Sequence, residues 1–341
     1  MTPKELVTSA LAGRPLPRTP VGPLAVHFCA PAAGYTLREY TTSAQVLADS
    51  VIRYYERFKP DAVWVSADTW VSAEAMGAQV GATGDNQPFG GIGEPLVRSA
   101  ADIDRIPAPD VGNQGRYPLM LEALSKVVAA LGKEVFVVAC FDQYPFSLAA
   151  ALMGINQIML KVLDDPPFVE ALMQRCSDYA LAYARALGQA GAQMLSGGDS
   201  PAGLLSPDLY RQLALPSEKS LIASIKSSRS TLHVSLHICG NATPILPMMA
   251  SSGADVLELD HAVNIGEACR IVGPDIALWG NLDPVRVLAQ GTPESVRHKA
   301  LETLHAVEAA SHRRFVLSSG CTLAVETPPE NLDALFTCQK Q

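Results

Sequence analysis

The sequence predicts an α/β protein built as a (β/α)8 barrel, the TIM barrel. Eight short apolar runs recur along the chain, and helix-like stretches separate them after the first 60 residues. Continuous apolar runs, as opposed to alternating ones, are typical of parallel strands buried on both faces. Eight such strands alternating with helices are the pattern of a barrel. The expected strands are Leu24–Cys29, Ala62–Ser66, Val135–Phe141, Gln193–Ser196, Leu232–Ile238, Val256–Leu259, Ile276–Gly280 and Phe315–Ser318.

Two of the intervening helices carry clear end signals. Residues 166–190 begin with two prolines and have glycines close to their end. Residues 292–310 begin with Thr292 followed by Pro293, which is an N-cap residue with proline at the first helical position. Both stretches are therefore expected to be the long helices that connect parallel strands.

Two segments interrupt this alternation. Residues 1–23 have helical character and then several prolines, and we interpret them as an N-terminal lead-in to the barrel. Residues 77–118 are rich in glycine and proline, and a long excursion of this kind is typical of a lid or rim. No internal repeat or low-complexity tract divides the chain, so we expect a single barrel domain over 1–341.

The composition excludes several classes of protein. Hydrophobic residues make up 48% of the 341 residues and the formal net charge is −8. Disorder is excluded by the high apolar content, and nucleic-acid binding is disfavoured because no basic block is present. No run approaches the roughly 18 apolar residues of a membrane span. The first residues lack the pattern of a secretory signal. We therefore expect a cytoplasmic protein without nucleic-acid or membrane partners.

The chain has seven cysteines. An odd number in a cytoplasmic protein argues against a disulfide framework and leaves metal binding or catalysis open for some of them. Two of them, with one histidine, form the most informative pattern. His237 and Cys239 lie two residues apart at the end of an expected strand, so their side chains point to the same face. They are placed to hold one zinc ion, although a core histidine beside a buried cysteine fits the spacing equally well.

A third ligand follows the last expected strand. Cys321 stands directly after Gly320, 82 residues beyond Cys239 in the sequence. All strands of a barrel deliver their carboxyl ends to one rim, so Cys321 is expected to reach the same metal. The alternative is that Cys321 is a small apolar side chain filling space beside Gly320.

A carboxylate is the expected fourth ligand. Asp260 ends the strand that follows His237, and alternation places Glu258 on the same face. One histidine, two cysteines and one carboxylate would complete a tetrahedral zinc site. The sequence leaves open whether Asp260 or Glu258 is the ligand, and Asp260 could instead cap a helix or pair with His261.

The charges of this ligand set indicate a reaction. Zinc with two thiolates is neutral, and Asp260 makes the site −1. Exchange of that carboxylate for an incoming thiolate keeps the charge at −1, so no new buried charge is created. A thiol bound to zinc is deprotonated, and thiolate-rich ligands leave its sulfur nucleophilic. The set therefore favours alkylation of a thiol over hydrolysis.

These residues carry a resemblance to a known family. The chain resembles the uroporphyrinogen decarboxylase superfamily and, within it, the zinc-dependent methylcobalamin:thiol methyltransferases of the coenzyme M type. The cobalamin-independent methionine synthases look similar at this site, with an acidic zinc ligand near the place of Asp260. The matching stretches are residues 65–70 (VSADTW), 145–149 (PFSLA), 237–241 (HICGN), 279–284 (WGNLDP), 319–321 (SGC) and 327–331 (TPPEN).

The resemblance implies a TIM barrel and a zinc ion held by His237, Cys239 and Cys321. It implies methyl transfer between methylcobalamin and a thiol. The chain lacks the D-x-H-x-x-G loop of cobalamin-binding domains, so the corrinoid is expected on a separate partner protein. The decarboxylase branch uses arginines in an N-terminal motif, whereas residues 20–37 contain no arginine or lysine. No basic cluster marks a pocket for the sulfonate of coenzyme M, although Arg98 or Arg116 could serve.

Further polar residues at strand ends are candidate contacts for substrate or cofactor. In a barrel this is where substrate is bound, although helix capping and turn formation explain such residues equally well. Asn281, in the stretch that matches the family, is the candidate catalytic residue beside Asp260. Tyr144 is expected either to close over the cofactor or to pack at the rim. The remaining candidates are Asp68, Asp142, Asp199 and Asn241.

Four functions remain open from the sequence. The leading one is methyl transfer from methylcobalamin on a corrinoid protein to a thiol activated by zinc. The second is transfer from a methylated substrate to the corrinoid protein. The third is a decarboxylase of the uroporphyrinogen type, and the fourth is a binding protein in which zinc is structural.

Overall fold

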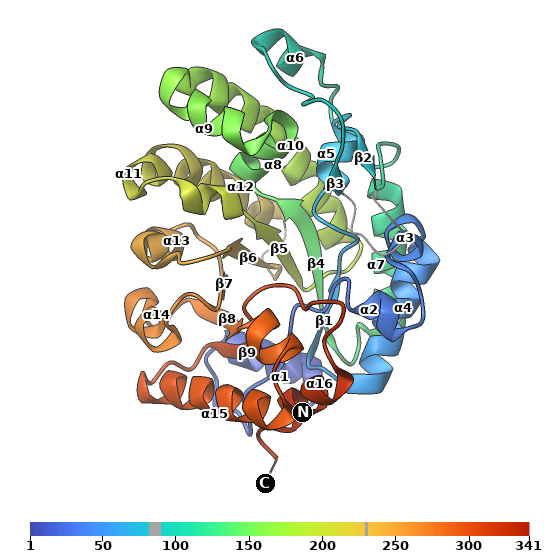
Figure 1. The fold of residues 1–341 in the computed structure, drawn as a ribbon, viewed down its shortest axis with the longest axis vertical. Coiled ribbons are helices and arrows are strands. Elements are labelled where there is room, and N and C mark those ends of the chain that lie inside the picture. Colours follow the sequence, from blue (N-terminus) through green and yellow to red (C-terminus); the bar gives the residue numbers. More distant parts are fainter. Residues whose placement is uncertain (82–89, 229–230, 341) are drawn as a thin grey trace.

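The computed structural model of the protein describes residues 1–81, 90–228 and 231–340, and Figure 1 shows its course. Seven strands form one sheet in the order β1-β4-β5-β6-β7-β8-β9, and every neighbouring pair is parallel. Seven of the eight expected strands are thereby confirmed. Their bounds are β1 (Ala62–Val65), β4 (Phe136–Gln143), β5 (Met194–Gly198), β6 (His233–Ile238), β7 (Val256–Leu259), β8 (Ala277–Leu282) and β9 (Phe315–Ser319).

The expected strand at Leu24–Cys29 is wrong. An isolated bridge between Val21 and Leu317 is found just before it. The Gly22 N–H donates to the Leu317 carbonyl at 2.9 Å, and the Asp61 N–H donates to the Val21 carbonyl at 2.9 Å. Residues 20–22 thus contact β9 on one side and the residue preceding β1 on the other. Prolines 20 and 23 offer no N–H group, so the pairing cannot extend into a regular strand.

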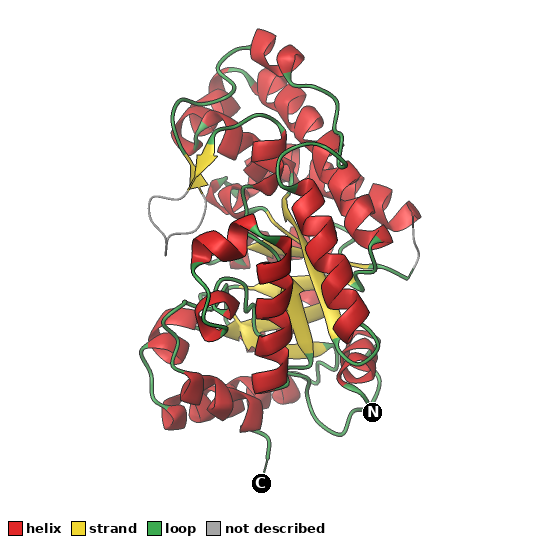
Figure 2. Cartoon of the chain, turned by 90° about the vertical axis from the view of Figure 1, so that its right-hand side faces the viewer, coloured by secondary structure: helices red, strands yellow, loops and turns green. Residues whose placement is uncertain are grey.

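Helices flank the sheet, as Figure 2 shows. The expected helices at 166–190 and 292–310 are confirmed as α10 (Pro166–Gln189) and α15 (Pro293–Ala309), and Thr292 caps α15 through the Ser295 N–H. The other α-helices are α1 (Pro3–Leu11), α2 (Cys29–Ala32), α3 (Leu37–Thr42), α4 (Ala44–Phe58), α5 (Val71–Ala75), α6 (Ala100–Arg105), α7 (Tyr117–Leu131), α8 (Pro145–Met153), α9 (Ile155–Asp164), α11 (Pro207–Leu209), α12 (Leu215–Ser228), α13 (Leu246–Ala250), α14 (Ile265–Val272) and α16 (Pro329–Thr337).

Short helices of other types follow three of the strands. Ser200–Leu204 and Thr243–Ile245 are 3-10 turns after β5 and β6, and Pro284–Ala289 is a π-helical turn after β8. A second π-helical turn, Tyr210–Ala214, lies between α11 and α12. These segments shape the carboxyl-terminal edge of the sheet, where the candidate site is found.

The two irregular segments of the sequence contain local structure. Helix α1 occupies part of residues 1–23, and its capping residue Thr2 accepts a hydrogen bond from the Glu5 N–H. In the stretch 77–118, β2 (Val80–Gly81) pairs antiparallel with β3 (Gly90–Gly91), and α6 follows. Residues 82–89 lie outside the described part of the chain. The role of 77–118 as a lid stays a prediction.

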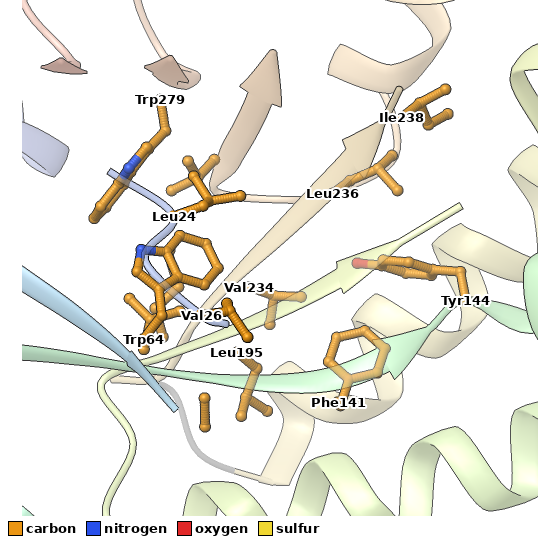
Figure 3. Packing of buried hydrophobic residues seen from close by; sticks show 14 of the residues in the cluster. Leu24, Val26, Trp64, Phe141, Tyr144, Leu195, Val234, Leu236, Ile238 and Trp279 are labelled. Carbon is orange, nitrogen blue, oxygen red and sulfur yellow. The ribbon is translucent and has the colours of Figure 1, made fainter. Parts of the chain in front are cut away.

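Residues 20–22, which contact both edges of the sheet, are followed by apolar side chains that belong to the core. Figure 3 shows two of these, Leu24 and Val26, beside Trp64, Trp279 and Leu195. The rings of Trp64 and Trp279 meet edge to face at 6.0 Å between centroids. The Trp279 indole N–H donates to the Gly22 carbonyl at 2.7 Å. The core therefore fixes this segment, although it is not a strand.

In the described ranges, no single helix is long and apolar enough to cross a membrane. Helices α8 and α9 pass that test only when taken together, and they are bent by 112° at their junction.

Candidate active site

Three side chains that the sequence predicted as metal ligands come together. The His237 Nε2 and Cys239 Sγ atoms are 3.1 Å apart, and the Sγ atoms of Cys239 and Cys321 are 3.9 Å apart. The ligand atoms of all three residues lie within 4.8 Å of one another. His237 is on β6 and Cys239 follows it, whereas Cys321 follows β9. Strand alternation and the shared rim of a parallel sheet thus assemble the predicted cluster.

The imidazole of His237 is held by its other nitrogen. His237 Nδ1 lies 3.0 Å from the Glu258 carbonyl oxygen, the residue with which His237 is in register on β7. A carbonyl only accepts, so Nδ1 carries a proton, and Nε2 is the ring nitrogen that faces the two cysteines. A second hydrogen bond of this kind is what orients histidines that bind metals.

Cys321 reaches this cluster because Gly320 lets its loop approach the loop after β7. A Cβ atom on Gly320 would lie 2.4 Å from the His261 backbone nitrogen and 3.1 Å from the Asp260 carbonyl carbon. The Gly320 N–H also donates to the Leu282 carbonyl at 2.7 Å. Only a residue without a side chain fits there, and Cys321 is fixed as the next residue.

The hydrogen bond between the two thiols separates their acidities. It lowers the pKa of Cys239 to about 7 and, together with burial, raises the pKa of Cys321 to about 12. Burial lowers the pKa of His237, but its hydrogen bond and charge interaction with Cys321 outweigh this and raise the pKa to about 9. The cluster thus already favours one thiolate near neutral pH.

The structure does not bring Asp260 into the cluster. The Asp260 carboxylate accepts a hydrogen bond from the Ala262 N–H at 2.8 Å and lies 3.0 Å from His261 Nδ1. Within the described residues, the group whose ligand atoms converge consists of the histidine and the two cysteines. Asp260 therefore pairs with His261, as the sequence offered for its alternative role, and it supports a turn, whereas the helix α14 that follows is capped by Asn264.

Glu258 faces the same pocket as the three ligands. Its carboxyl group is buried and accepts a hydrogen bond from the Ser235 hydroxyl, while its Oε2 atom has no partner among the described groups. Burial raises the pKa of Glu258. Of the two carboxyl groups that the sequence left open as a fourth ligand, Glu258 is the one in the pocket wall.

The pocket opens at the carboxyl ends of the strands and encloses about 290 Å³. Its metal-ligand side is formed by His237, Cys239 and Cys321, and Leu24, Val26 and Trp64 supply apolar walls. Such a cavity is at the small end of the range for ligand pockets, which is roughly 300–1,000 Å³. It accommodates a small molecule.

Asp68 and Asp142, both predicted contacts, line this pocket. The Asp68 carboxylate is paired with the guanidinium of Arg116 at 2.5 Å. Asp142 is buried in a left-handed conformation with φ 68°, and its Oδ2 accepts from the Ser72 N–H at 2.7 Å. Its Oδ1 has no partner among the described groups. Burial, and then the charge of Asp68, raise the pKa of Asp142 to about 8.

The other predicted contacts do not line the pocket. Tyr144 is fully buried, not at the rim, because its hydroxyl donates to the Ser235 carbonyl at 2.8 Å and its ring packs on Phe141, as Figure 3 shows. Asp199 is buried and accepts from the Ser147 N–H at 2.8 Å. Asn241 makes a turn by accepting from the Thr243 N–H at 3.2 Å.

Asn281 also lies outside the pocket wall. Its amide donates to the Asp260 carbonyl at 3.0 Å and to the Val263 carbonyl at 2.7 Å. The side chain thereby fixes the loop after β7, against which Gly320 packs. The structure gives Asn281 a positioning role, and contact with substrate stays a prediction.

His27 and Trp64 are among the residues of the pocket wall that sequence reasoning did not predict. His27 lines the pocket, and its Nε2 lies 2.8 Å from the Ala67 carbonyl. Trp64 lines it from β1. The sequence places Cys29 two residues after His27 without a further ligand near them, and the Cys29 thiol donates to the Ala25 carbonyl. For an apolar residue inside a strand, such as Trp64, the sequence does not show whether its side chain lies in the core or in a pocket wall.

Comparison with known proteins agrees with this geometry. Residues 2–341 match the family described as uroporphyrinogen decarboxylase (URO-D). The chain is 30% identical to a methylcobamide:CoM methyltransferase, MtbA, of Methanosarcina acetivorans, over 99% of this chain and 98% of that protein. It is 27% identical to a uroporphyrinogen decarboxylase of Trichodesmium erythraeum, over 90% of this chain and 85% of that protein.

A solved structure extends the likeness to the fold. A methyltransferase from Methanosarcina mazei superimposes with a TM-score of 0.89 at 25% sequence identity, covering 99% of this chain and 98% of that one. The seven-stranded parallel α/β fold and the match over the full length lead to one conclusion. The chain belongs to the uroporphyrinogen decarboxylase (URO-D) family.

Proposed function

We propose that this protein is a corrinoid-dependent methyltransferase that moves a methyl group between methylcobalamin, carried by a partner corrinoid protein, and a small thiol. The observation that carries the proposal is the convergence of His237, Cys239 and Cys321 on one wall of the pocket. The name and full-length identity of the methylcobamide:CoM methyltransferase relative support it.

The three residues fit a zinc ion. Zinc takes nitrogen and sulfur ligands in tetrahedral sites, and catalytic sites keep one position for substrate. His237 Nε2 faces the two cysteines and would bind the metal once its proton is lost, and the two cysteines offer sulfur. Glu258 is the better supported carboxylate ligand, since it lines the pocket and Asp260 does not. When bound, zinc lowers the pKa of a coordinated thiol so that its sulfur is a thiolate at neutral pH.

Other residues of the chain position the metal ligands. The Glu258 carbonyl holds the imidazole of His237 in one tautomer, and Gly320 and Asn281 position the loops that carry Cys321 and Asp260. In the reaction the thiol loses its proton, a carbon–sulfur bond forms, and the carbon–cobalt bond breaks with its electron pair remaining on cobalt.

The corrinoid itself is proposed to stay on its partner. The cavity of about 290 Å³ suits a small thiol and not a corrin macrocycle. The partner would therefore present the methyl group at the mouth of the pocket, at the carboxyl ends of the strands. We further propose that residues 20–22 complete a barrel within a single domain over 1–341, and the cytoplasmic location stays a prediction.

The opposite direction, from a methylated substrate to the corrinoid protein, uses the same site and is the second candidate. Decarboxylation of a porphyrinogen is disfavoured, although decarboxylase relatives are found. Among the described residues, the lining of the pocket contains no arginine or lysine to bind several carboxylates. A purely structural zinc is disfavoured by the placement of the cluster in the wall of a pocket.

The test is thiol-dependent turnover of free methylcobalamin by the zinc-loaded protein, followed by visible absorption and by detection of the methyl thioether. We expect turnover that requires both zinc and a thiol. Turnover of a methylated donor with cob(I)alamin, without any thiol-dependent reaction, would move the assignment to the second candidate. Zinc-loaded protein inactive in both directions would contradict the proposal.

A further inference from the structure

Two buried carboxyl groups beside the metal cluster have no part in the proposed reaction. Asp199 directly follows β5, and Glu218 lies in the first turn of α12. Both residues are fully buried, and neither lines the pocket. None of the main interactions of either carboxyl group is with a lysine, an arginine or a histidine of the described chain. Two ionised carboxylates side by side in such surroundings would repel each other, so one of them is expected to hold a proton.

Hydrogen bonds account for two of the four oxygen atoms in this pair. Asp199 Oδ1 accepts a hydrogen bond from the Ser147 N–H at 2.8 Å, and Glu218 Oε2 accepts one from the Tyr210 hydroxyl at 2.6 Å. The other two oxygen atoms, Asp199 Oδ2 and Glu218 Oε1, have no donor among the described groups. A proton on Glu218 Oε1 that is donated to Asp199 Oδ2 gives all four buried oxygen atoms one partner each.

The acidities of the two groups place this proton on Glu218. Burial raises the pKa of Asp199 to about 6, and hydrogen bonds from Ser147 and Glu218 limit the rise. Burial raises the pKa of Glu218 well above its ordinary value, and the charge of Asp199 raises it further. Glu218 is therefore the acid that donates, and Asp199 is the carboxylate that accepts.

Asp199 is connected to two of the metal ligands through the backbone. Its N–H donates to the His237 carbonyl at 2.8 Å, and the hydroxyl of the next residue, Ser200, accepts the Cys239 N–H at 3.3 Å. Its side chain is held by the first turn of α8 and by α12, through the contacts described above. The carboxylate of Asp199 thus ties the loop that contacts Cys239 to two helices.

We propose that Asp199 and Glu218 form a positioning pair for the metal ligand Cys239. The protonated Glu218 donates a hydrogen bond to the Asp199 carboxylate, and this bond fixes the loop from which Ser200 holds the Cys239 N–H. Removal of a hydrogen bond that orients a metal ligand from outside the site typically weakens metal binding by about 10–100-fold. The inference rests on the proposed function, in that it requires a metal ion at this cluster.

Two substitutions of Glu218 separate its hydrogen bond from its packing. Glu218→Gln keeps the size of the side chain and an N–H donor for Asp199, whereas Glu218→Met keeps a similar size without a donor. Competition with a chelator gives the zinc Kd of each protein, and visible absorption of the Co²⁺-loaded protein reports the geometry of the thiolate ligands. We expect Glu218→Gln to stay within about threefold of the natural Kd and Glu218→Met to raise it by about tenfold or more, with an altered Co²⁺ spectrum.

Two further variants check the cause. Ser200→Ala leaves the Cys239 N–H without its acceptor and should raise the zinc Kd by several-fold. Asp61→Ala is the matched control for lost stability, because it removes a buried carboxylate just before β1, at the other end of the strands. It should unfold more easily than the natural protein and still bind zinc with the natural Kd.

The natural Kd and Co²⁺ spectrum in Glu218→Met would overturn the inference. So would a Glu218→Gln protein with the weak binding expected of Glu218→Met, because the donor would then have no effect. If Glu218→Met does not fold, Ser200→Ala decides, and an unchanged Kd in that variant overturns the link to Cys239. A natural protein that binds zinc as expected but transfers no methyl group in either direction would contradict the proposed function and leave this inference standing.

Discussion

Hydrogen bonds hold His237 and Cys239 in place and leave the ligand atom of each residue free. The Glu258 carbonyl occupies His237 Nδ1, so Nε2 is left for the two cysteines. The Ser200 hydroxyl accepts the Cys239 N–H at 3.3 Å and fixes that residue after the strand ends. Both contacts act through the backbone. They therefore position the ligands without placing another charge beside them.

The first prediction concerns the three ligands. Cys239→Ala and His237→Ala should each reduce bound zinc well below one ion per chain, because each removes one of the nitrogen and sulfur ligands that hold the metal. Metal analysis after dialysis measures this. The control is Cys269→Ala on α14, a buried cysteine outside the cluster, which should keep its zinc. Full zinc occupancy in both ligand variants would place the metal elsewhere.

The second prediction concerns Asp142 and pH. Burial raises the pKa of Asp142 in the folded protein to about 8 from an ordinary value of 3.8. The folded state thus binds this proton more tightly than the unfolded state does. Compared with a neutral side chain, the contribution of Asp142 to the free energy of unfolding is complete below about pH 3.8. It is lost as the pH rises from there through about 8.

Asp142→Asn should therefore gain stability over the natural protein as pH rises. The difference in Tm should be small near pH 5 and larger near pH 8.5, measured by circular dichroism in matched buffers. Asparagine suits this position because the residue has φ 68°, a conformation that asparagine adopts more readily than most residues. A Tm difference that is independent of pH would show that Asp142 is ionised throughout.

At the scale of elements, the site depends on how closely two loops approach. The loop after β9 passes against the loop after β7, and Gly320 is the point of contact. Asn281, at the end of β8, ties the second of these loops through the carbonyls of Asp260 and Val263. Residues at the ends of the neighbouring strands β7, β8 and β9 thus together determine the position of Cys321.

The third prediction follows from that contact. Gly320→Ala should lower both zinc affinity and the free energy of unfolding, the latter by about 1–3 kcal/mol, because the new methyl group meets backbone that must shift. Gly266→Ala on α14 is the matched control, since a Cβ there lies 3.5 Å from its nearest neighbour, Asn264 Oδ1. Zinc titration and urea denaturation measure both effects. Unchanged zinc affinity in Gly320→Ala would show that the loop does not position Cys321.

The elements that the sequence predicted correctly are those with a strong local pattern. Apolar runs such as Val256–Leu259 and the capped helix α15 were found within a few residues of their bounds. Leu24–Cys29 is similarly apolar but follows Pro23, and the Ala25 and Val26 N–H groups donate to the nearby Pro23 and Leu24 carbonyls instead of to a neighbouring strand. Local composition did not distinguish a buried irregular segment from a strand.

At the scale of the whole molecule, residues 20–22 connect the two edge strands of the sheet. Asp61, just before β1, fixes this segment by accepting the Val21 N–H at 2.7 Å and by pairing with Arg18 at 2.6 Å. Asp61 is buried, with 3% of its side chain exposed. Its contacts are therefore poorly replaced by water.

The fourth prediction is that Asp61→Ala lowers the free energy of unfolding by about 1–3 kcal/mol, because it leaves a buried N–H without a partner. Asp333→Ala is the matched control. It removes an aspartate–arginine pair of similar geometry, with Arg57 at 2.7 Å, but both side chains are about half exposed. That control should cost less than about 1 kcal/mol. Equal losses in the free energy of unfolding would mean that the contacts of Asp61 with residues 20–22 add no more stability than an exposed ion pair does.

The arrangement of the parallel sheet explains which site residues could be predicted from the sequence. His237, Cys239 and Cys321 could be predicted because residues two apart on a strand point to the same face and a parallel sheet brings its strand ends together. Asp260 and Glu258 could not be separated, since the exit angle of the chain after β7 decides which carboxylate faces the pocket. Tyr144 was misplaced because an aromatic residue after a strand has the same pattern at a rim and in a core.

The most direct test of the central claim is zinc K-edge X-ray absorption of the zinc-loaded protein, with and without a bound thiol. We expect one zinc per chain with nitrogen, oxygen and two sulfur neighbours. On addition of 2-mercaptoethanol, one oxygen neighbour should be lost and a third sulfur neighbour gained. Protein that holds no zinc, or zinc whose neighbours stay the same with every thiol tested, would contradict that claim.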